Sequence, residues 1–191
     1  MAQRRDRMKS LNDVLRLSPD EFFRYVSGID YGYMDVKGVV HRISPADNCA
    51  DQSGAPYRFS SPEQVVCNNC GWCWDIAELI RLWCERNSIE YKCVFLEYRS
   101  HELHRTHTQI FAKWNGKWYE APDNTSPVLF GENGYDSAKA CISAFADLFR
   151  AYLKHELGEK YDENRLLVKE FRNTVVSGLT DEEYLSIARS N

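Results

Sequence analysis

Apolar residues in the first part of the chain follow a helix-start signal. In the stretch SPDEFF, Ser18 is placed to cap a helix, Pro19 fits its first turn and Glu21 completes a capping box. Gly28 is a suitable residue to end this helix. We therefore expect a helix here, followed by a short strand over about residues 36–43.

The strongest helical periodicity begins at a cysteine. The stretch SSPEQVV repeats the start signal, with Ser61 as the cap and Gln64 closing the box. Beyond it, the pattern predicts a helix from Cys73 to about Asn87. The apolar residues on one face of this helix are Ile76, Ala77, Ile80, Trp83 and Cys84. Cys73 stands at the head of that face.

The middle of the chain predicts antiparallel strands. EYKCVFLEYR and THTQIFAKW have the length and the β-rich composition of strands, and Asn115-Gly116 is typical of a two-residue hairpin turn into KWYEA. Pairing outward from this turn puts His107 opposite Asn124 and Thr108 opposite Asp123. A histidine at the end of one strand therefore meets an Asp-Asn pair at the end of the other.

The C-terminal part is predicted to be mainly helical. A long amphipathic helix is expected over about residues 137–157, then a strand at about 165–169 and a helix that starts at Thr180. A helix, antiparallel strands and further helices make an α+β fold. With no internal repeat or linker, we expect one domain over 1–191, with a core at about 60–126 and a C-terminal helical extension at about 137–191.

Composition and charge narrow the range of functions. The chain has 191 residues and carries 24 Lys and Arg against 28 Asp and Glu, which argues against nucleic acid or an anionic membrane as its main partner. No apolar run approaches the ~20 residues of a membrane helix, and the N-terminus lacks the apolar segment of a signal peptide. The seven cysteines fall mostly inside predicted elements, so we expect reduced thiols and a cytoplasmic protein. The sequence does not predict the oligomeric state.

Three explanations compete for the cysteines of CNNCGWCWDIAEL. A metal site would combine them with His101, His104 and His107, but zinc needs four ligands and two such triplets overfill one site. No metal and no cofactor are therefore expected. A redox site would use Cys70 and Cys73, whose CGWC motif looks like that of thioredoxin. That motif normally follows a buried strand, whereas SSPEQVVCNN precedes it here.

The third explanation makes Cys73 a nucleophile. The partial positive charge at a helix N-terminus favours a thiolate. Such a nucleophile also needs a base held by a third group, which the hairpin supplies at its far end. The remaining cysteines of predicted elements, Cys84, Cys93 and Cys141, are expected in the core, and His101 and His104 at the surface.

At this point the residues resemble a family. GWCWD, followed by HTQIFAKWNGKWYEAPD, is similar to the transglutaminase-like superfamily of papain-like fold, and SPEQ and YGYMD resemble its bacterial members. The resemblance implies a nucleophile at a helix N-terminus, packed on an antiparallel sheet. It also implies Cys73 as the nucleophile, His107 as the base and Asp123 as the carboxylate that orients the base.

The sequence departs from the family at the orienting residue. The family carries its aspartate one position earlier, where Pro122 stands here. In strict register Asp123 points to the face opposite His107. Either a bulge near Pro122 redirects Asp123, or Asn124 orients the ring as an asparagine does in papain-like proteases. We favour Asp123.

The groups around the nucleophile are less specified. The backbone N–H of Cys73 is the natural first donor of an oxyanion hole. Three side chains are candidates for the second donor: Gln64, Asn68 and Asn69. Trp72 and Trp74 flank the nucleophile, either as part of a substrate groove or as core residues.

The expected activity is cysteine-dependent acyl transfer at an amide bond of a protein or peptide, through a thioester. Resolution by water would make the protein a peptidase or amidase, the outcome that we favour. Resolution by an amine would make it a protein-glutamine cross-linker. Two other functions stay open: a thiol-disulfide oxidoreductase at Cys70 and Cys73, and a catalytically inactive binding domain.

Overall fold

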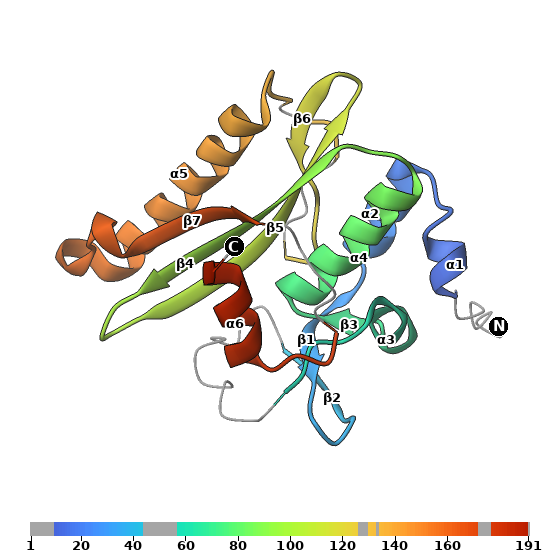
Figure 1. The fold of residues 1–191 in the computed structure, drawn as a ribbon, viewed down its shortest axis with the longest axis horizontal. Helices are drawn as coiled ribbons and strands as arrows, with labels where there is room; N and C mark the ends of the chain where they lie inside the picture. Colours follow the sequence, from blue (N-terminus) through green and yellow to red (C-terminus); the bar gives the residue numbers. More distant parts are fainter. Residues whose placement is uncertain (1–9, 44–56, 126–129, 133, 172–176, 191) are drawn as a thin grey trace, which may run out of the picture.

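The computed structural model describes residues 10–43, 57–125, 130–132, 134–171 and 177–190 (Figure 1). Its elements, in chain order, are α1 (Leu11–Val14), α2 (Pro19–Val26), β1 (Asp30–Met34), β2 (Val40–Arg42), α3 (Pro62–Asn68), β3 (Cys70–Gly71), α4 (Cys73–Arg86), β4 (Tyr91–Arg99), β5 (His104–Trp114), β6 (Lys117–Glu120), α5 (Ala138–Leu157), η2 (Gly158–Lys160), η3 (Glu163–Arg165), β7 (Leu166–Phe171) and α6 (Asp181–Ser190). The fold is α+β, as predicted.

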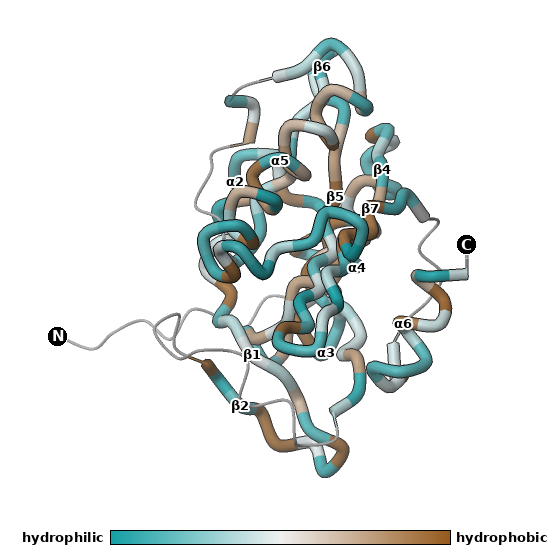
Figure 2. Tube along the Cα trace, turned by 90° about the vertical axis from the view of Figure 1, so that its left-hand side faces the viewer, coloured by the Kyte–Doolittle hydropathy of each residue, from teal (hydrophilic) through white to brown (hydrophobic). Residues whose placement is uncertain are grey.

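The strands form two sheets. The main sheet is antiparallel, with the strand order β6-β5-β4-β7. The smaller sheet has the order β2-β1-β3, in which β1 is antiparallel to β2 and parallel to β3. The β1–β2 hairpin lies at the end of the molecule opposite β6 (Figures 1 and 2).

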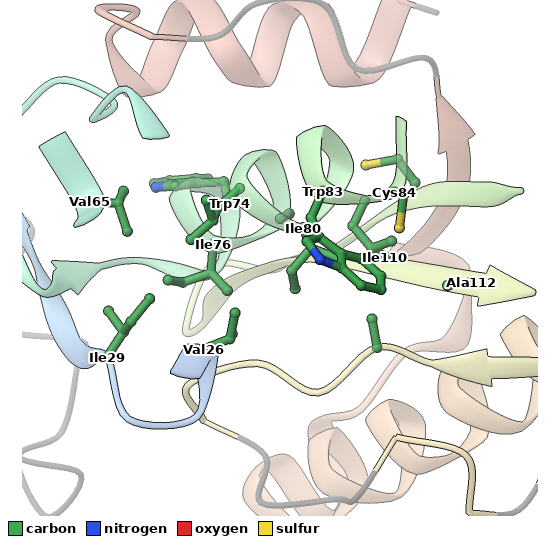
Figure 3. Close-up of a cluster of buried hydrophobic side chains, with 14 of the residues drawn as sticks. Val26, Ile29, Val65, Trp74, Ile76, Ile80, Trp83, Cys84, Ile110 and Ala112 are labelled. Carbon is green, nitrogen blue, oxygen red and sulfur yellow. The ribbon is translucent and has the colours of Figure 1, made fainter. Parts of the chain in front are cut away.

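Helices α4 and α5 cover opposite faces of the main sheet. Ile110 and Ala112 of β5 belong to the same buried cluster as Ile80 and Trp83 of α4 (Figure 3). Phe111, which lies between them in the strand, belongs to a second cluster on the α5 side. This division follows from the alternation of side chains along a strand.

The helix starts predicted from the sequence are confirmed. Ser18 and Ser61 cap α2 and α3, and Glu21 and Gln64 close their capping boxes. Helix α4 begins at Cys73, as expected. At α6, the side chain of Glu183 accepts the backbone N–H of Thr180 (2.8 Å). These signals are local, so the sequence alone identifies them.

The predicted strand over 36–43 is wrong in extent. The structure has a hairpin there, in which β1 precedes β2 and Asp35 closes the turn by accepting the N–H groups of Lys37 (2.8 Å) and Val39 (2.9 Å). The sequence of β1, DYGYM, hides its strand character because aspartate and glycine are rare in strands. Gly32 is required there, because an added Cβ would lie 2.1 Å from the carbonyl oxygen of His41.

This close approach gives a stability prediction. We expect Gly32→Ala to lower the free energy of unfolding by about 3 kcal/mol, since backbone must move to admit the methyl group. Gly38 is the matched control. It has a φ of +82° and no atom within 4 Å of an added Cβ, so Gly38→Ala carries only the backbone strain, about 1 kcal/mol. Urea melts of both variants measure the difference, and equal losses would contradict the predicted contact.

The C-terminal part is integral to the domain rather than a helical extension. Strand β7 pairs with β4 in the main sheet. Tyr184 of α6 is fully buried, and its hydroxyl lies 2.6 Å from that of Thr108 in β5. The side chain of Arg189 forms an ion pair with the buried Glu97 of β4, including a 2.8 Å bond from Nε. Helix α6 therefore closes the sheet end that carries His107.

None of the helices in the described ranges is long and apolar enough to cross a lipid bilayer.

Candidate active site

A buried carboxylate fixes the N-terminus of α4. Asp75 accepts the backbone N–H groups of Trp72 (3.1 Å) and Ser60 (2.9 Å), so it holds the turn on both sides of Cys73. Burial raises the pKa of Asp75 to about 7, although both hydrogen bonds act in the opposite direction. The turn that presents Cys73 is therefore anchored to the loop before α3 as well as to its own helix.

The Cys73 thiol lies at the uncovered edge of β5. Its sulfur accepts the backbone N–H of Thr108, and the residue is 7% exposed. The Ala121 N–H donates to the Ile110 carbonyl (2.9 Å), so these two residues form a hydrogen-bonded pair of the hairpin. Such pairs recur at every second residue, so in an uninterrupted hairpin the Thr108 N–H would point toward residue 123. Strand β6 ends at Glu120, so the thiol occupies that place.

The protonation state of Cys73 differs from the sequence expectation. Burial raises the pKa of the thiol to about 12, and the nearby Asp123 raises it further, while the N–H groups of Thr108 and Trp74 lower it. Desolvation thus outweighs the field of the helix N-terminus, which was expected to favour a thiolate. In the free protein the sulfur is a neutral thiol at neutral pH.

His107 projects from β5 toward α5. Its ring lies against that of Phe145, with centroids 5.7 Å apart, and its side chain is 19% exposed. Burial lowers the pKa of the imidazole, whereas Asp123 and a hydrogen bond to Gln109 raise it. The net direction is downward, so the ring is neutral at neutral pH and able to accept a proton.

Asp123, and not Asn124, lies against the histidine. Oδ2 of Asp123 is 3.8 Å from Nε2 of His107, and Oδ1 accepts both the backbone N–H and the hydroxyl of Thr125 at 2.7 Å. The Asn124 amide donates instead to the carbonyl of Gly71 (2.9 Å) and more weakly to that of Asp30 (3.3 Å). Asn124 thus ties the turn before Cys73 to this loop.

The register problem is resolved by the end of the strand rather than by a bulge. The β5–β6 pairing follows the expected register as far as Phe111 and Glu120. Asn115 and Gly116 have the positive φ values of 50° and 81° that the predicted two-residue turn requires. Beyond Ala121 the chain leaves the ladder at Pro122, which has no N–H, and the Asp123 side chain turns toward His107.

Asp123 acts on both Cys73 and His107, but the three side chains form no closed hydrogen-bond chain among the described residues. The backbone N–H of Thr108, the residue that follows His107, is directed to the thiol. In the described parts of the chain, no hydrogen bond joins the Cys73 sulfur to the imidazole. Catalytic hydrogen bonds are often loose in a free enzyme and shorten when substrate binds.

Gln109 is a polar residue of the site that the sequence analysis missed. It is 1% exposed, and its side chain contacts Nε2 of His107 (3.3 Å) and the Ala121 carbonyl (2.6 Å). Nearby, burial and the charge of Asp123 raise the pKa of Glu120 to about 7. The signal was present: Gln109 is polar within an apolar strand, two residues from His107 and on the same face.

The predicted oxyanion donors are engaged elsewhere in the free protein. The Gln64 side chain accepts the Ser61 N–H (2.8 Å) in the cap of α3, and the Asn69 amide donates to the Gly28 carbonyl (3.3 Å). The Asn68 amide is directed to the sulfur of Met34 (3.7 Å). In the described ranges, none of the three is hydrogen-bonded to Cys73.

Two indole N–H groups beside Cys73 have no acceptor among the described residues. Nε1 of Trp72 and Nε1 of Trp74 are both buried without a hydrogen-bond partner among the described residues. The ring of Trp74 packs on Phe59 at 4.3 Å and belongs to the main core. Trp72 is only half-buried and stacks on Tyr33 at 5.4 Å, so of the two it is the one that can line a groove.

The other cysteines have separate surroundings. Cys70 belongs to β3 of the small sheet, where its thiol is directed to the His41 carbonyl (3.9 Å), and burial raises its pKa to about 11. Cys67 is exposed. The cysteines expected in the core are buried there: Cys84, Cys93 and Cys141. None of the six cysteines in the described ranges is in a disulfide.

The histidines outside the site lie near the surface. His101 and His104 are both exposed, and Nε2 of His104 lies 2.8 Å from the Glu97 carboxylate. Over the described parts of the chain, no group of three or more His, Cys, Asp and Glu side chains is arranged to hold a metal ion.

Comparisons with known proteins do not place the chain in a family. No protein-family model matches it, and a search of curated proteins finds no significant similarity. The candidate site therefore stands on its own geometry.

Proposed function

We propose that this chain is a papain-like, transglutaminase-like domain that catalyses acyl transfer at an amide bond through a thioester on Cys73. The supporting observation is that the charge of Asp123 acts on both Cys73 and His107 at the edge of β5. The Thr108 N–H bonds the Cys73 sulfur, and Asp123 lies 3.8 Å from Nε2 of His107. Covalent catalysis by a cysteine needs a nucleophile, a base and a group that orients the base.

The reaction begins from neutral groups. As the Cys73 sulfur attacks the amide carbonyl carbon, its proton passes to His107, and the carbonyl oxygen becomes an oxyanion. Collapse of this intermediate breaks the C–N bond, and the His107 imidazolium gives its proton to the leaving amine. Water, activated by the neutral imidazole, then attacks the thioester and releases the acid with the Cys73 thiol restored.

Burial explains why a base and a carboxylate are both needed. With the pKa of Cys73 raised to about 12, little thiolate exists before substrate binds, so proton transfer accompanies the attack. The imidazolium that forms is itself disfavoured by burial. The negative charge of Asp123 offsets that cost, which is the role of the carboxylate in other triads.

The acceptor that resolves the thioester separates hydrolysis from cross-linking. We favour water, and thus a peptidase or amidase acting on a protein or peptide, over transfer to a second amine. The disulfide alternative is weaker, because the two thiols are directed to different groups. The Cys70 thiol is directed to the His41 carbonyl, whereas the Cys73 sulfur lies at the Thr108 N–H. The half-buried Trp72, stacked on Tyr33, offers an apolar wall for the substrate beside the nucleophile.

Alkylation kinetics test the proposal, with an internal control in the same chain. Iodoacetamide should modify the exposed Cys67 fastest, since solvent reaches it freely. Cys73 should react more slowly, at a rate that depends on proton transfer to His107. We expect His107→Ala to lower the alkylation rate of Cys73 at least about tenfold, and to leave Cys67 unchanged. Peptide mass spectrometry over time gives both rates.

Two outcomes would contradict the proposal. Equal alkylation rates of Cys70 and Cys73, both dependent on redox state, would favour the oxidoreductase. A Cys73 rate that is the same with and without His107 would leave the domain without a base, as expected of an inactive binding domain. Circular dichroism of the His107→Ala protein verifies that the fold is intact.

A further inference from the structure

The Gln109 amide can be oriented only one way. Its Nε2 lies 2.6 Å from the Ala121 carbonyl oxygen and 3.5 Å from Oε1 of Glu120. A carbonyl oxygen accepts and never donates, so the NH₂ end of the amide must face Ala121. The oxygen end, Oε1, therefore faces His107, at 3.3 Å from Nε2. The main-chain carbonyl thus determines which end of the side chain the histidine meets.

We infer that Gln109 is a positioning residue that holds His107 in the tautomer with the proton on Nε2. An amide oxygen facing Nε2 makes a favourable contact only if that nitrogen carries a hydrogen. In the neutral ring Nδ1 is then left with its lone pair, which makes it the atom that accepts the proton of Cys73. This inference rests on the proposed function, because it names the basic atom of the same site.

Asp123 supports the same tautomer from the same side. Its Oδ2 lies 3.8 Å from Nε2, outside hydrogen-bond range, whereas the Gln109 oxygen, at 3.3 Å, is within reach of the ring among the described residues. Nδ1 has no hydrogen-bond partner in the described ranges of the chain. The Phe145 ring, tilted by 32° with its centroid 5.7 Å away, lies against the imidazole and limits its rotation.

The charged and titratable groups around His107 come from several elements. Asp123 approaches from the loop after β6, Glu120 from β6 behind Gln109, and Cys73 from the start of α4. On the α5 side, Cys141 lies close to Glu120. A carboxylate accepts hydrogen bonds, as the Gln109 oxygen does, so Asp123 also favours a proton on Nε2.

The test separates the acceptor role of Gln109 from its packing. Gln109→Met keeps nearly the same length but removes the acceptor for Nε2. Gln109→Glu keeps an acceptor oxygen toward the ring but, when ionised, loses the donor to Ala121. Lys113→Met is the matched control: Lys113 lies on the same face of β5, is exposed, and pairs with Glu90 far from the site. Nitrogen-detected NMR of ¹⁵N-histidine protein reports the tautomer, with His107→Ala to assign the signal.

The expected results differ between the variants. Wild type and Lys113→Met should both have His107 in the Nε2–H form. Gln109→Met should give a mixture of tautomers and lower kcat by about tenfold to about a hundredfold, with KM little changed, because ring orientation acts on the chemical step. Gln109→Glu should keep the Nε2–H form and more of the activity than Gln109→Met, although it melts at a lower temperature.

Three outcomes would overturn the inference: a wild-type ring protonated on Nδ1, a Gln109→Met protein with an unchanged tautomer, or equal kcat losses in Gln109→Met and Gln109→Glu. The last result would mean that Gln109 acts only through its hydrogen bond to the Ala121 carbonyl. The NMR readout needs no substrate, so failure of the proposed activity and failure of this inference are distinguishable. An inactive protein with Nε2–H fixed by Gln109 would contradict only the former.

Discussion

Cys73→Ala is expected to abolish acyl transfer and leave the fold intact. The sulfur is the atom that bonds to the acyl group, so its removal leaves no thioester route, and we expect a loss of about 10⁴-fold to 10⁶-fold in rate. Stability should change by only about 1 kcal/mol, because the side chain is small and its sulfur is a weak acceptor for the N–H groups of Thr108 and Trp74. Alanine also keeps the helix start at this position.

His107→Ala should cause nearly the same loss. The thiol has a pKa raised to about 12, so without a base it cannot lose its proton at neutral pH. Members of one catalytic unit are not additive, and the Cys73→Ala, His107→Ala double variant should be no slower than either single variant. An activated acyl ester provides the assay: a burst of leaving group, and an acyl adduct located at Cys73 by mass spectrometry.

The exposed thiol supplies the control for this assay. Cys67→Ser should leave the burst unchanged, because Cys67 lies on α3 and is solvent-exposed. Acyl labelling of the Cys73→Ala protein at the wild-type rate, or a burst that disappears in Cys67→Ser, would disprove the assignment of the nucleophile.

How far the sequence predicts this molecule depends on the range of the interactions involved. Caps and turns act within a few residues, so the starts of α2, α3 and α4 and the Asn115-Gly116 turn were predicted correctly. Strand β1 was missed because it depends on a distant partner. Its glycine is needed for contact with β2, and no local pattern marks such a contact.

The electrostatics of the candidate site differ from what the sequence predicts. A helix N-terminus favours a thiolate by an effect that the sequence makes visible, but burial depends on the whole fold. Helix α6, more than a hundred residues away in the chain, brings the buried Tyr184 against Thr108 and helps to exclude water from the sulfur. The sign of the Cys73 pKa shift is therefore a tertiary property.

The position of Asp123 depends both on the register counted from the turn and on the place where the β5–β6 ladder ends. Register counted from the turn is correct up to Glu120, and it would put Asp123 on the wrong face. Pro122 ends the ladder because it has no N–H to donate. The same interruption frees the Thr108 N–H for the Cys73 sulfur and lets Asp123 turn to His107. One local feature thus assembles two sides of the site.

The relative importance of Asp123 and Asn124 is the second large effect that we expect. Asp123→Ala should lower the rate by about 10²-fold to 10⁴-fold, because the imidazolium loses its counter-charge in a buried place. Asn124→Ala should cost less than about tenfold in rate. Its amide bonds the carbonyls of Gly71 and Asp30, so the loss should appear mainly as about 1 kcal/mol of stability.

The pH dependence distinguishes the charge of Asp123 from its shape. Its charge raises the pKa of His107, so Asp123→Asn should lower that pKa further. The neutral base would then persist to lower pH, and the acidic limb of kcat/KM should move to lower pH while the maximum rate falls. Asn124→Asp, the matched change, should leave the limb in place, because residue 124 faces Gly71 and not the ring. If Asn124→Ala is the more damaged enzyme, or the acidic limb stays fixed in Asp123→Asn, then the orienting group is Asn124 and the site is a Cys-His-Asn triad.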